Sequence, residues 1–263
     1  MMNLNFYKYQ GAGNDFVLID NRKNTVNNHN KEQVSLICNR RFGIGADGLM
    51  LLNSHAEYDF EMKYYNADGN LGSMCGNGGR CIVAFAKQLG IIQNETTFLA
   101  VDGPHYAKIA DKEGWVNLQM IDVETITQTE NAFTLNTGSP HYVVLQPNLE
   151  DFDVYTAGKK IRNSPLFLAK GINVNFVEEK GDEYAVRTYE RGVEDETFAC
   201  GTGVTAVALA MAKLKNQLGE HTTKIKTLGG ALEIKFIFDG QKFKDVFLCG
   251  PAKAVFQGQF LMP

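Results

Sequence analysis

Two segments of the sequence place a cysteine directly before glycines: "CGNGGRC" at residues 75–81 and "CGTG" at residues 200–203. A cysteine sulfur reacts as its thiolate, so the thiol pKa decides what chemistry it can do. Each motif runs into an apolar pattern of helical period, which predicts that Cys75 and Cys200 each begin a helix. The unpaired N–H groups and the dipole at a helix N-terminus stabilise a thiolate and bind anions.

These positions predict proton transfer by the two sulfurs. The helix dipole lowers a thiol pKa from ~8.5 to only ~7–8, so both protonation states are populated near neutral pH. Repulsion between two thiolates that face each other across a cleft favours one thiolate and one thiol. Such a pair can remove a proton from one side of a carbon stereocentre and return one to the other side. The amides of Gly76–Asn77 and Gly201–Thr202 can hold the substrate carboxylate.

Other uses of the cysteines fit the sequence less well. Five cysteines without a secretion signal argue against a disulfide framework. Cys75 and Cys81 are the only close pair, whereas structural zinc sites usually need two, so no metal is expected. Neither motif ends in the Lys-Ser or Lys-Thr of a phosphate loop. Cys38 and Cys249 lie in apolar segments and are predicted to pack in the core, as is Cys81 on its helix.

The elements that must position the two cysteines repeat along the chain. A strand-like stretch precedes each motif, at residues 59–65 and 183–189, and each helical pattern closes on Leu-Gly, at Gly90 and Gly219. Residues 96–120 and 231–238 predict antiparallel strands. The repetition predicts two similar domains, 1–120 and 121–250, with both glycines ending their helices.

Composition sets the broad class of the protein. The 263 residues are 44% hydrophobic and 21% charged, which is typical of a soluble globular chain. No apolar run is long enough for a membrane span and the N-terminus lacks a signal pattern, so we expect a cytoplasmic protein. The net charge of −4 without a basic stripe argues against nucleic-acid binding.

Several segments together resemble the ordered motifs of the diaminopimelate epimerase family. They are "GAGNDF" (11–16), "NADG" (66–69), "MCGNGGRC" (74–81), "GSPH" (138–141), "NVNF" (173–176), "ERG" (190–192) and "ETFACGTG" (196–203). The resemblance implies a cofactor-independent interconversion of LL- and meso-2,6-diaminopimelate, on the bacterial route to lysine and peptidoglycan precursors. It also implies an α+β fold of two pseudo-symmetric domains, each a curved, mostly antiparallel sheet wrapped around a central helix, with a last strand (251–263) returning to the first domain.

The same resemblance implies a role for each candidate residue. Cys75 and Cys200 are the base and acid, exchanging roles with the direction of reaction. The distal end of the substrate is implied to meet Asn66, Asn173 and Arg191, and the reacting end Asn14, Glu190 and His141, with Ser139 in support. Taken singly, each has an ordinary interpretation as a turn, strand or surface residue. Grouped around two Cys-Gly-X-Gly motifs, they favour a substrate site.

The chain departs from the family pattern at three places. Ser139 stands where many members have Asn, Gly48 stands where some have Gln, and the loop 191–197 is one residue longer than usual.

Two alternative functions stay open at this point. A proline-type amino-acid racemase could share the cysteine pair, although the polar distal set argues against a small ring substrate. A thiol redox module could link Cys75 to Cys81 or to Cys200. The expected partner is a small amino acid, and a homodimer is one possible assembly.

Overall fold

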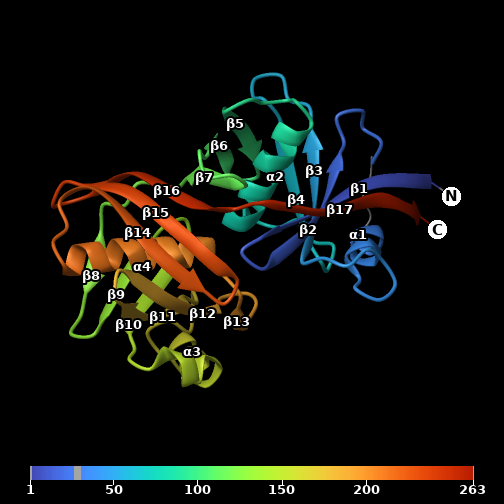
Figure 1. The fold of residues 1–263 in the computed structure, drawn as a ribbon. Coiled ribbons are helices and arrows are strands. Elements are labelled where there is room, and N and C mark those ends of the chain that lie inside the picture. The colour runs from blue at the N-terminus through green and yellow to red at the C-terminus, as the bar shows by residue number, and fades with distance from the viewer. Residues whose placement is uncertain (1, 27–30, 263) are drawn as a thin grey trace. The chain divides into compact units, whose positions relative to one another are not determined.

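The computed structural model describes residues 2–26 and 31–262, and these fall into two compact units. The first comprises Met1–Leu118 with Pro251–Pro263, and the second comprises Gln119–Gly250. Each unit is a mostly antiparallel sheet with one central helix, so the α+β class expected from the sequence is confirmed (Figure 1).

The first unit is a sheet in which the first strand of the chain, β1, pairs with the last one, β17. Its elements are β1 (Met2–Gly11), β2 (Asn14–Asp20), α1 (Lys31–Cys38), β3 (Gly48–Asn53), β4 (Glu61–Asn66), α2 (Gly76–Gln88), β5 (Glu95–Ala100), β6 (Gly103–Ile109), β7 (Trp115–Gln119) and β17 (Lys253–Met262). Strand β1 pairs antiparallel with both β17 and β2, β2 is parallel to β3, and β3 is antiparallel to β4. Strand β4 is parallel to β5, and β5, β6 and β7 continue antiparallel.

The second unit repeats this order of pairings. Its elements are β8 (Ile126–Gln128), β9 (Ala132–Asn136), β10 (Pro140–Leu145), η1 (Leu149–Asp151), α3 (Val154–Arg162), β11 (Asn173–Lys180), β12 (Glu183–Glu190), β13 (Asp195–Thr197), α4 (Gly201–Leu214), β14 (Gly219–Thr227), β15 (Gly230–Phe238) and β16 (Phe243–Pro251). Strands β8, β9 and β10 are antiparallel, β10 is parallel to β11, and β11 is antiparallel to β12. Strand β12 is parallel to β14, and β14, β15 and β16 are antiparallel.

The registers give a residue-by-residue correspondence between the units. Phe16 pairs with Gly48 at the start of the parallel β2–β3 ladder, as His141 pairs with Asn173 at the start of β10–β11. Phe16 therefore corresponds to His141. Two residues further on, Met50 pairs with Tyr64 across β3–β4, and Asn175 pairs with Thr188 across β11–β12, so these pairs correspond as well.

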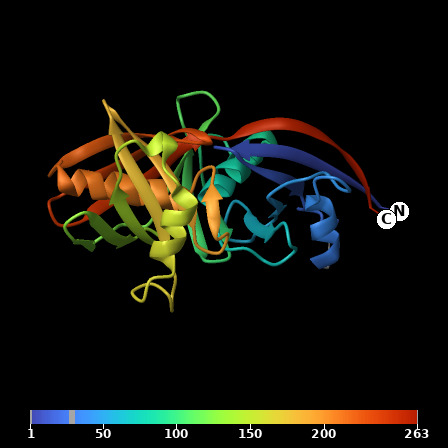
Figure 2. The same cartoon turned by 90° about the horizontal axis from the view of Figure 1, so that it is seen from below.

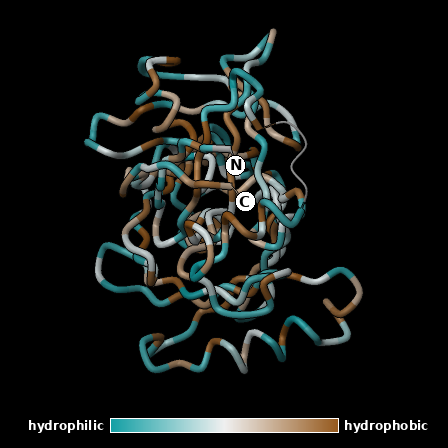
Figure 3. Tube along the Cα trace, turned by 90° about the vertical axis from the view of Figure 1, so that its right-hand side faces the viewer, coloured by the Kyte–Doolittle hydropathy of each residue, from teal (hydrophilic) through white to brown (hydrophobic). Residues whose placement is uncertain are grey.

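The central helices are buried for reasons that their sequences explain. Helix α4 is apolar nearly all round, with every residue from Gly203 to Ala212 buried, as expected for a helix covered on all sides. It packs against six strands of its own unit, and Figure 2 shows it lying among them. Helix α2 buries Ile82, Val83 and Phe85 against β1, β2, β3, β6 and β17. Along β15, buried residues alternate with exposed or half-buried ones, as expected for a strand with one covered face. Hydrophobic and hydrophilic colours likewise alternate along the trace in Figure 3.

The helix ends confirm one prediction and correct another. Gly90 ends α2 as predicted, with φ +70° and an N–H that donates to Lys87 O. The prediction that Gly219 ends the second helix is wrong, because α4 stops at Leu214 and Gly219 begins β14. Asn216 ends the helix instead, taking the left-handed conformation (φ 50°) that is usually assigned to glycine.

The three remaining cysteines lie in the core. Cys38, Cys81 and Cys249 are all buried, as predicted. Among residues 2–26 and 31–262, no group of three or more His, Cys, Asp and Glu side chains could hold a metal ion. No helix of the described chain is long and apolar enough to cross a membrane.

Candidate functional site

In the first unit, Cys75 is the N-cap residue of α2, as the sequence predicts. Its backbone is extended (φ −109°, ψ 125°), and its carbonyl accepts the first helical hydrogen bond, from Gly79 N at 2.7 Å. The side chain is half-buried. The sulfur therefore sits at the positive end of the helix dipole, where a thiolate is stabilised. Gly76 follows it and is buried.

Asn14 is held by hydrogen bonds to both ends of its amide. Asn77 Nδ2 donates to Asn14 Oδ1 at 2.6 Å, and Asn14 Nδ2 donates to Asp47 Oδ2 at 2.9 Å. Because Asp47 can only accept, the Asn14 amide has one defined orientation. Arg80, buried on α2, donates to Asn77 Oδ1 at 2.9 Å. The first turn of α2 and Asn14 thus form one polar chain.

Ion pairs hold the two carboxylates next to Asn14, those of Asp15 and Asp47. Asp15 receives ion pairs from Lys8 at 2.7 Å and from Arg40 at 2.6 Å, and Arg40 also reaches Asp47 at 2.8 Å. Burial alone would raise the pKa of Asp15, but the hydrogen bonds from Arg40 and Lys8 hold that pKa well below its usual range. Asp15 therefore stays ionised throughout the neutral range.

Asn66 ends β4 opposite Gly48, next to the same carboxylate cluster. Its N–H donates to Asn70 O at 2.9 Å, and the following residue, Ala67, donates to Asp47 O at 3.1 Å. Gly48 has no room for a side chain, because a Cβ there would overlap the ring of Tyr64 and lie 2.6 Å from Tyr65 O. A side chain at position 48 would therefore require Tyr64 to move.

In the second unit, Cys200 is the N-cap of α4 in nearly the same conformation (φ −102°, ψ 111°). Its side chain is buried, and its Sγ lies 3.5 Å from Thr202 Oγ1. Thr137 Oγ1 donates to Thr202 O at 2.8 Å, which ties the helix start to the loop before Ser139. Gly201, between the two, is buried.

Three predicted residues of the second unit form one hydrogen-bonded cluster. Asn173 Nδ2 donates to Ser139 Oγ at 2.9 Å, and Arg191 Nη2 reaches the same oxygen at 3.3 Å. Asn173 Oδ1 in turn accepts from Arg191 N at 2.9 Å. Ser139, shorter than the Asn of many family members, serves here as the shared acceptor. The exposed Arg191 guanidinium suits a carboxylate, which it can bind with paired hydrogen bonds.

His141 is completely buried at the start of β10. Its Nδ1 lies 3.1 Å from Asn175 Nδ2, and Thr188 Oγ1 donates to Asn175 Oδ1 at 3.0 Å. Burial lowers the pKa of His141 to about 3, and the positive charge of Arg191 adds to this shift. The imidazole is therefore neutral at physiological pH.

Glu190 ends β12 beside Arg191. Its Oε2 accepts from Thr197 Oγ1 at 2.8 Å, and burial raises the pKa of its carboxyl in spite of that bond. The longer loop is accommodated by Glu194, which is left-handed (φ 59°) and donates through its N–H to Glu190 O at 2.8 Å. Glu190 is thus a carboxyl that protonates more readily than an exposed one.

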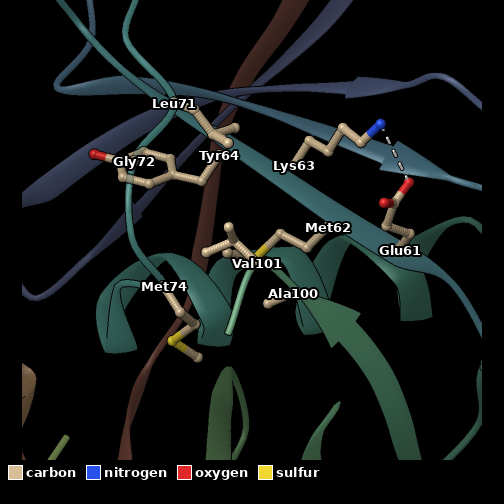
Figure 4. Close-up of a pocket in the computed structure, with 9 residues that line it drawn as sticks. All are labelled: Glu61, Met62, Lys63, Tyr64, Leu71, Gly72, Met74, Ala100 and Val101. Atoms are coloured by element: carbon tan, nitrogen blue, oxygen red, sulfur yellow. Dashed lines mark ion pairs between the residues drawn. The ribbon is translucent and has the colours of Figure 1, made fainter. Parts of the chain in front are cut away.

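A hollow lies on the first unit, lined in part by strand β4 (Figure 4). Its walls are largely aliphatic, and Glu61 and Lys63 form an ion pair at 3.7 Å on its rim. Two lining residues adjoin predicted site residues: Met74 precedes Cys75, and a Cβ on Gly72 would stand 3.1 Å from Asn66 Oδ1. The lining offers no cluster of polar groups that would orient an amino acid.

Sequence reasoning missed three residues that hold predicted ones in place: Asp47, Asn175 and Thr188. Asp47 orients Asn14, and Asn175 with Thr188 contacts His141. Asn175 lies inside the "NVNF" motif and Asp47 directly precedes Gly48, so both are next to positions that the sequence analysis had considered. Their roles depend on strand register, which the sequence does not display.

Comparison with known proteins reveals close relatives. The sequence model of the family described as diaminopimelate epimerase matches residues 6–126 and 133–255, one segment in each repeat. A diaminopimelate epimerase of Flavobacterium psychrophilum is 50% identical over 255 residues, which cover 97% of this chain and 99% of the relative.

Solved structures share the fold at much lower identity. A phenazine biosynthesis protein of the PhzF family from Bacillus anthracis has a TM-score of 0.79 at 13% identity and covers 100% of both chains. A hydroxyproline epimerase from Agrobacterium vitis has a TM-score of 0.69 at 12% identity, covering 98% of this chain and 92% of its own. These similarities establish the fold. The reaction has to be inferred from the residues of the site.

Proposed function

The chain belongs to the diaminopimelate epimerase family, and we propose from this premise that it interconverts LL- and meso-2,6-diaminopimelate without a cofactor. The observation that carries the proposal is the repeated placement of a cysteine at the N-cap of a central helix, Cys75 on α2 and Cys200 on α4. The activity would supply precursors of lysine and peptidoglycan.

In the proposed mechanism, the two sulfurs act on opposite faces of one α-carbon. The thiolate of one cysteine takes the α-proton and becomes a thiol, and the electron pair of the broken C–H bond spreads into the α-carboxylate. The thiol of the other cysteine then donates its proton to the opposite face and becomes a thiolate. Reversal of direction exchanges the two roles, so each cysteine serves as base for one stereoisomer.

The amides at the two helix starts are the proposed cradle for the α-carboxylate. Gly76–Asn77 and Gly201–Thr202 follow the cysteines directly, where backbone N–H groups and the dipole favour negative charge. Charge that develops on the carboxylate during deprotonation would be stabilised there.

The remaining predicted residues divide between the two ends of the substrate. Arg191 and Asn173, joined through Ser139, are proposed to bind the distal amino-acid head, together with Asn66. Asn14 and Glu190 are proposed to orient the amino group at the reacting carbon, and His141 to assist the thiols. The oriented amide of Asn14 and the raised pKa of Glu190 support these assignments.

The test is exchange of the α-proton with solvent. The reduced protein is incubated with LL-diaminopimelate in D₂O, and deuterium at the α-carbon is followed together with the appearance of the meso isomer. We expect both from the unmodified protein and a loss of about 10²–10⁴-fold for Cys75→Ala or Cys200→Ala. Cys38→Ala and Cys249→Ala, which remove buried sulfurs of the same two units, serve as matched controls and should retain activity.

Two results would contradict the proposal. One is full epimerisation by both Cys75→Ala and Cys200→Ala, and the other is no exchange by the reduced, folded protein. Proline is tested in parallel, because the hydroxyproline epimerase shares the fold. Racemisation of proline in place of diaminopimelate would assign the chain to the other substrate class.

A further inference from the structure

His141, Asn175 and Thr188 form a polar cluster that is at most 3% exposed at any member. The Asn175 amide nitrogen donates to Tyr142 O at 3.3 Å, and a carbonyl can only accept, so this side of the amide must be the NH₂ group. Thr188 donates to the opposite atom, Asn175 Oδ1, at 3.0 Å. The Tyr142 carbonyl therefore fixes the orientation of the amide, and the Thr188 hydroxyl supplies the donor that its oxygen needs.

The orientation of Asn175 determines the tautomer of His141. The same NH₂ group lies 3.1 Å from His141 Nδ1, so Nδ1 must act as the acceptor. In a neutral imidazole the hydrogen is then carried by Nε2. Burial lowers the pKa of His141 to about 3, which keeps the ring neutral.

His141 Nε2 is a buried donor for which the described residues provide no hydrogen-bond partner. Buried N–H groups are nearly always paired, because an unmet donor loses its hydration without compensation. The acceptor for Nε2–H is therefore expected to be a group that enters or ionises at the site.

The cluster lies directly against the first turn of α4. A Cβ placed on Gly203 would overlap Asn175 Oδ1 and would stand 3.3 Å from Cys200 Sγ. The absence of a side chain at Gly203 thus brings the amide of Asn175 close to the reactive cysteine. At the corresponding positions the first unit has Phe16, Met50 and Tyr64, so the fold itself does not require an imidazole and an amide there.

We propose that Asn175 and Thr188 are positioning residues that hold His141 as its Nε2–H tautomer, so that it donates a hydrogen bond to an anion at the start of α4. The proposal rests on the proposed function. The anion is either the Cys200 thiolate or a substrate carboxylate; both accept through a negatively charged atom.

The tautomer is tested without substrate. Reduced protein labelled with ¹⁵N in its histidine rings is examined by NMR, and His141→Gln identifies the His141 signals. We expect a protonated Nε2 and an unprotonated Nδ1. Asn175→Met, which copies Met50 of the first unit, should produce a mixture of tautomers. Thr188→Val should produce a weaker version of the same change, and it covers the case in which Asn175→Met fails to fold.

The consequence is tested in two further measurements on the same variants. Alkylation of Cys200 by iodoacetamide near neutral pH, followed by peptide mass spectrometry, should slow by roughly 3–10-fold in Asn175→Met if the thiolate is the acceptor. If the substrate carboxylate is the acceptor, alkylation is unchanged and KM for LL-diaminopimelate rises by a similar factor of roughly 3–10. Thr223→Val, a buried threonine of the same unit outside the cluster, should change neither.

Three results would overturn the proposal: a wild-type His141 protonated on Nδ1, an unchanged tautomer in Asn175→Met, or a changed tautomer with unchanged alkylation and KM. A wild-type protein that shows the expected tautomer and slower alkylation in Asn175→Met, but no exchange with diaminopimelate, would refute the proposed function alone. The NMR and alkylation arms therefore separate the two failures.

Discussion

The two units have the same order of strand pairings and differ in what lies beneath the first turn of the central helix. In the first unit, Phe16 meets Tyr64 edge-on, with ring centroids 6.0 Å apart, and Met50 fills the space next to Gly78. In the second unit the corresponding residues are His141, Asn175 and Thr188. Two aromatic rings and a methionine are sufficient to support this helix start, so the imidazole, amide and hydroxyl of the second unit are better explained by chemistry than by stability.

The units also differ in where their charges lie. Around Asn14 the first unit gathers ionised groups, Asp15 and Asp47 with Lys8 and Arg40. Beneath Cys200, the described residues His141, Asn175 and Thr188 form a cluster of neutral polar groups, and the exposed Arg191 follows the end of β12. The same fold therefore fixes one helix start through ion pairs and the other through buried amide, hydroxyl and imidazole groups.

The largest expected effect comes from placing an imidazole at position 16 of the first unit, which corresponds to His141. Phe16→His should lower the free energy of unfolding by about 3–4 kcal/mol, because packing is lost and a buried ring nitrogen lacks its amide partner. Urea unfolding measures the change. Adding Met50→Asn and Tyr64→Thr should restore part of the loss, since the three residues are coupled. A loss below about 1 kcal/mol for the single variant would show that the two environments are equivalent.

The glycines at the third helical position should respond unequally to alanine. Gly203→Ala forces Asn175 Oδ1 to move and breaks the hydrogen bond that it accepts from Thr188. The variant should lower the free energy of unfolding by about 2 kcal/mol. At Gly78 the obstacle is the flexible end of Met50, and alanine gains up to about 1 kcal/mol of helix propensity, so the variant should lie within about 1 kcal/mol of wild type. Thermal or urea unfolding compares them, and equal losses would contradict the difference.

Acid should weaken the protein through His141. The folded state keeps this ring neutral down to a pKa of about 3, whereas the unfolded chain binds the proton near 6.5. Between these values the unfolded state binds more protons, so stability falls as pH falls, by up to about 2 kcal/mol at pH 5. His141→Gln should therefore lose less stability between pH 7 and pH 5 in urea unfolding. His221→Gln, at a half-buried site of the same unit, should follow the wild type.

The smallest effects are expected at the helix C-termini. Both helices end in the same hydrogen-bond motif, with Gly90 at one left-handed position and Asn216 at the other. Asn216→Gly should stabilise the protein and Gly90→Asn should destabilise it, each by about 0.5–1 kcal/mol. Because the sites are far apart in the chain and share no partner, the double variant should be close to wild type. Urea unfolding measures both changes, and a lower free energy of unfolding for Asn216→Gly would contradict the left-handed conformation at position 216.

Much of the fold was predictable because its signals are local. The apolar periods after Cys75 and Cys200 predicted both central helices, and the strand-like segments before them predicted the repeat. The C-terminus of α4 was mispredicted because Leu218–Gly219 repeats the Leu-Gly that ends α2, while the residue that stops the helix is Asn216. Asparagine tolerates the left-handed conformation but gives a weaker signal than glycine.

The site was only partly predictable, because its supporting residues come together through long-range register. Asn175 contacts His141 from a parallel neighbour strand, and Thr188 reaches Asn175 from the next strand along. A shift of one residue in either pairing would turn these side chains to the other face of the sheet. The resemblance to the family identified His141 as a candidate, and only the structure revealed which residues hold it.

The strand β17 has a consequence for how the chain is made. It pairs with β1 along its whole length, from Gln10 with Lys253 to Met2 with Met262. Strand β17 is therefore made after every other described strand, and β1, which pairs with β2 on one side, has an open edge on its other side until β17 is available. The second unit is continuous from Gln119 to Gly250 and can be complete before the first unit closes. Synthesis thus makes all the strands of the second unit, up to β16, before it makes the strand that completes the first unit.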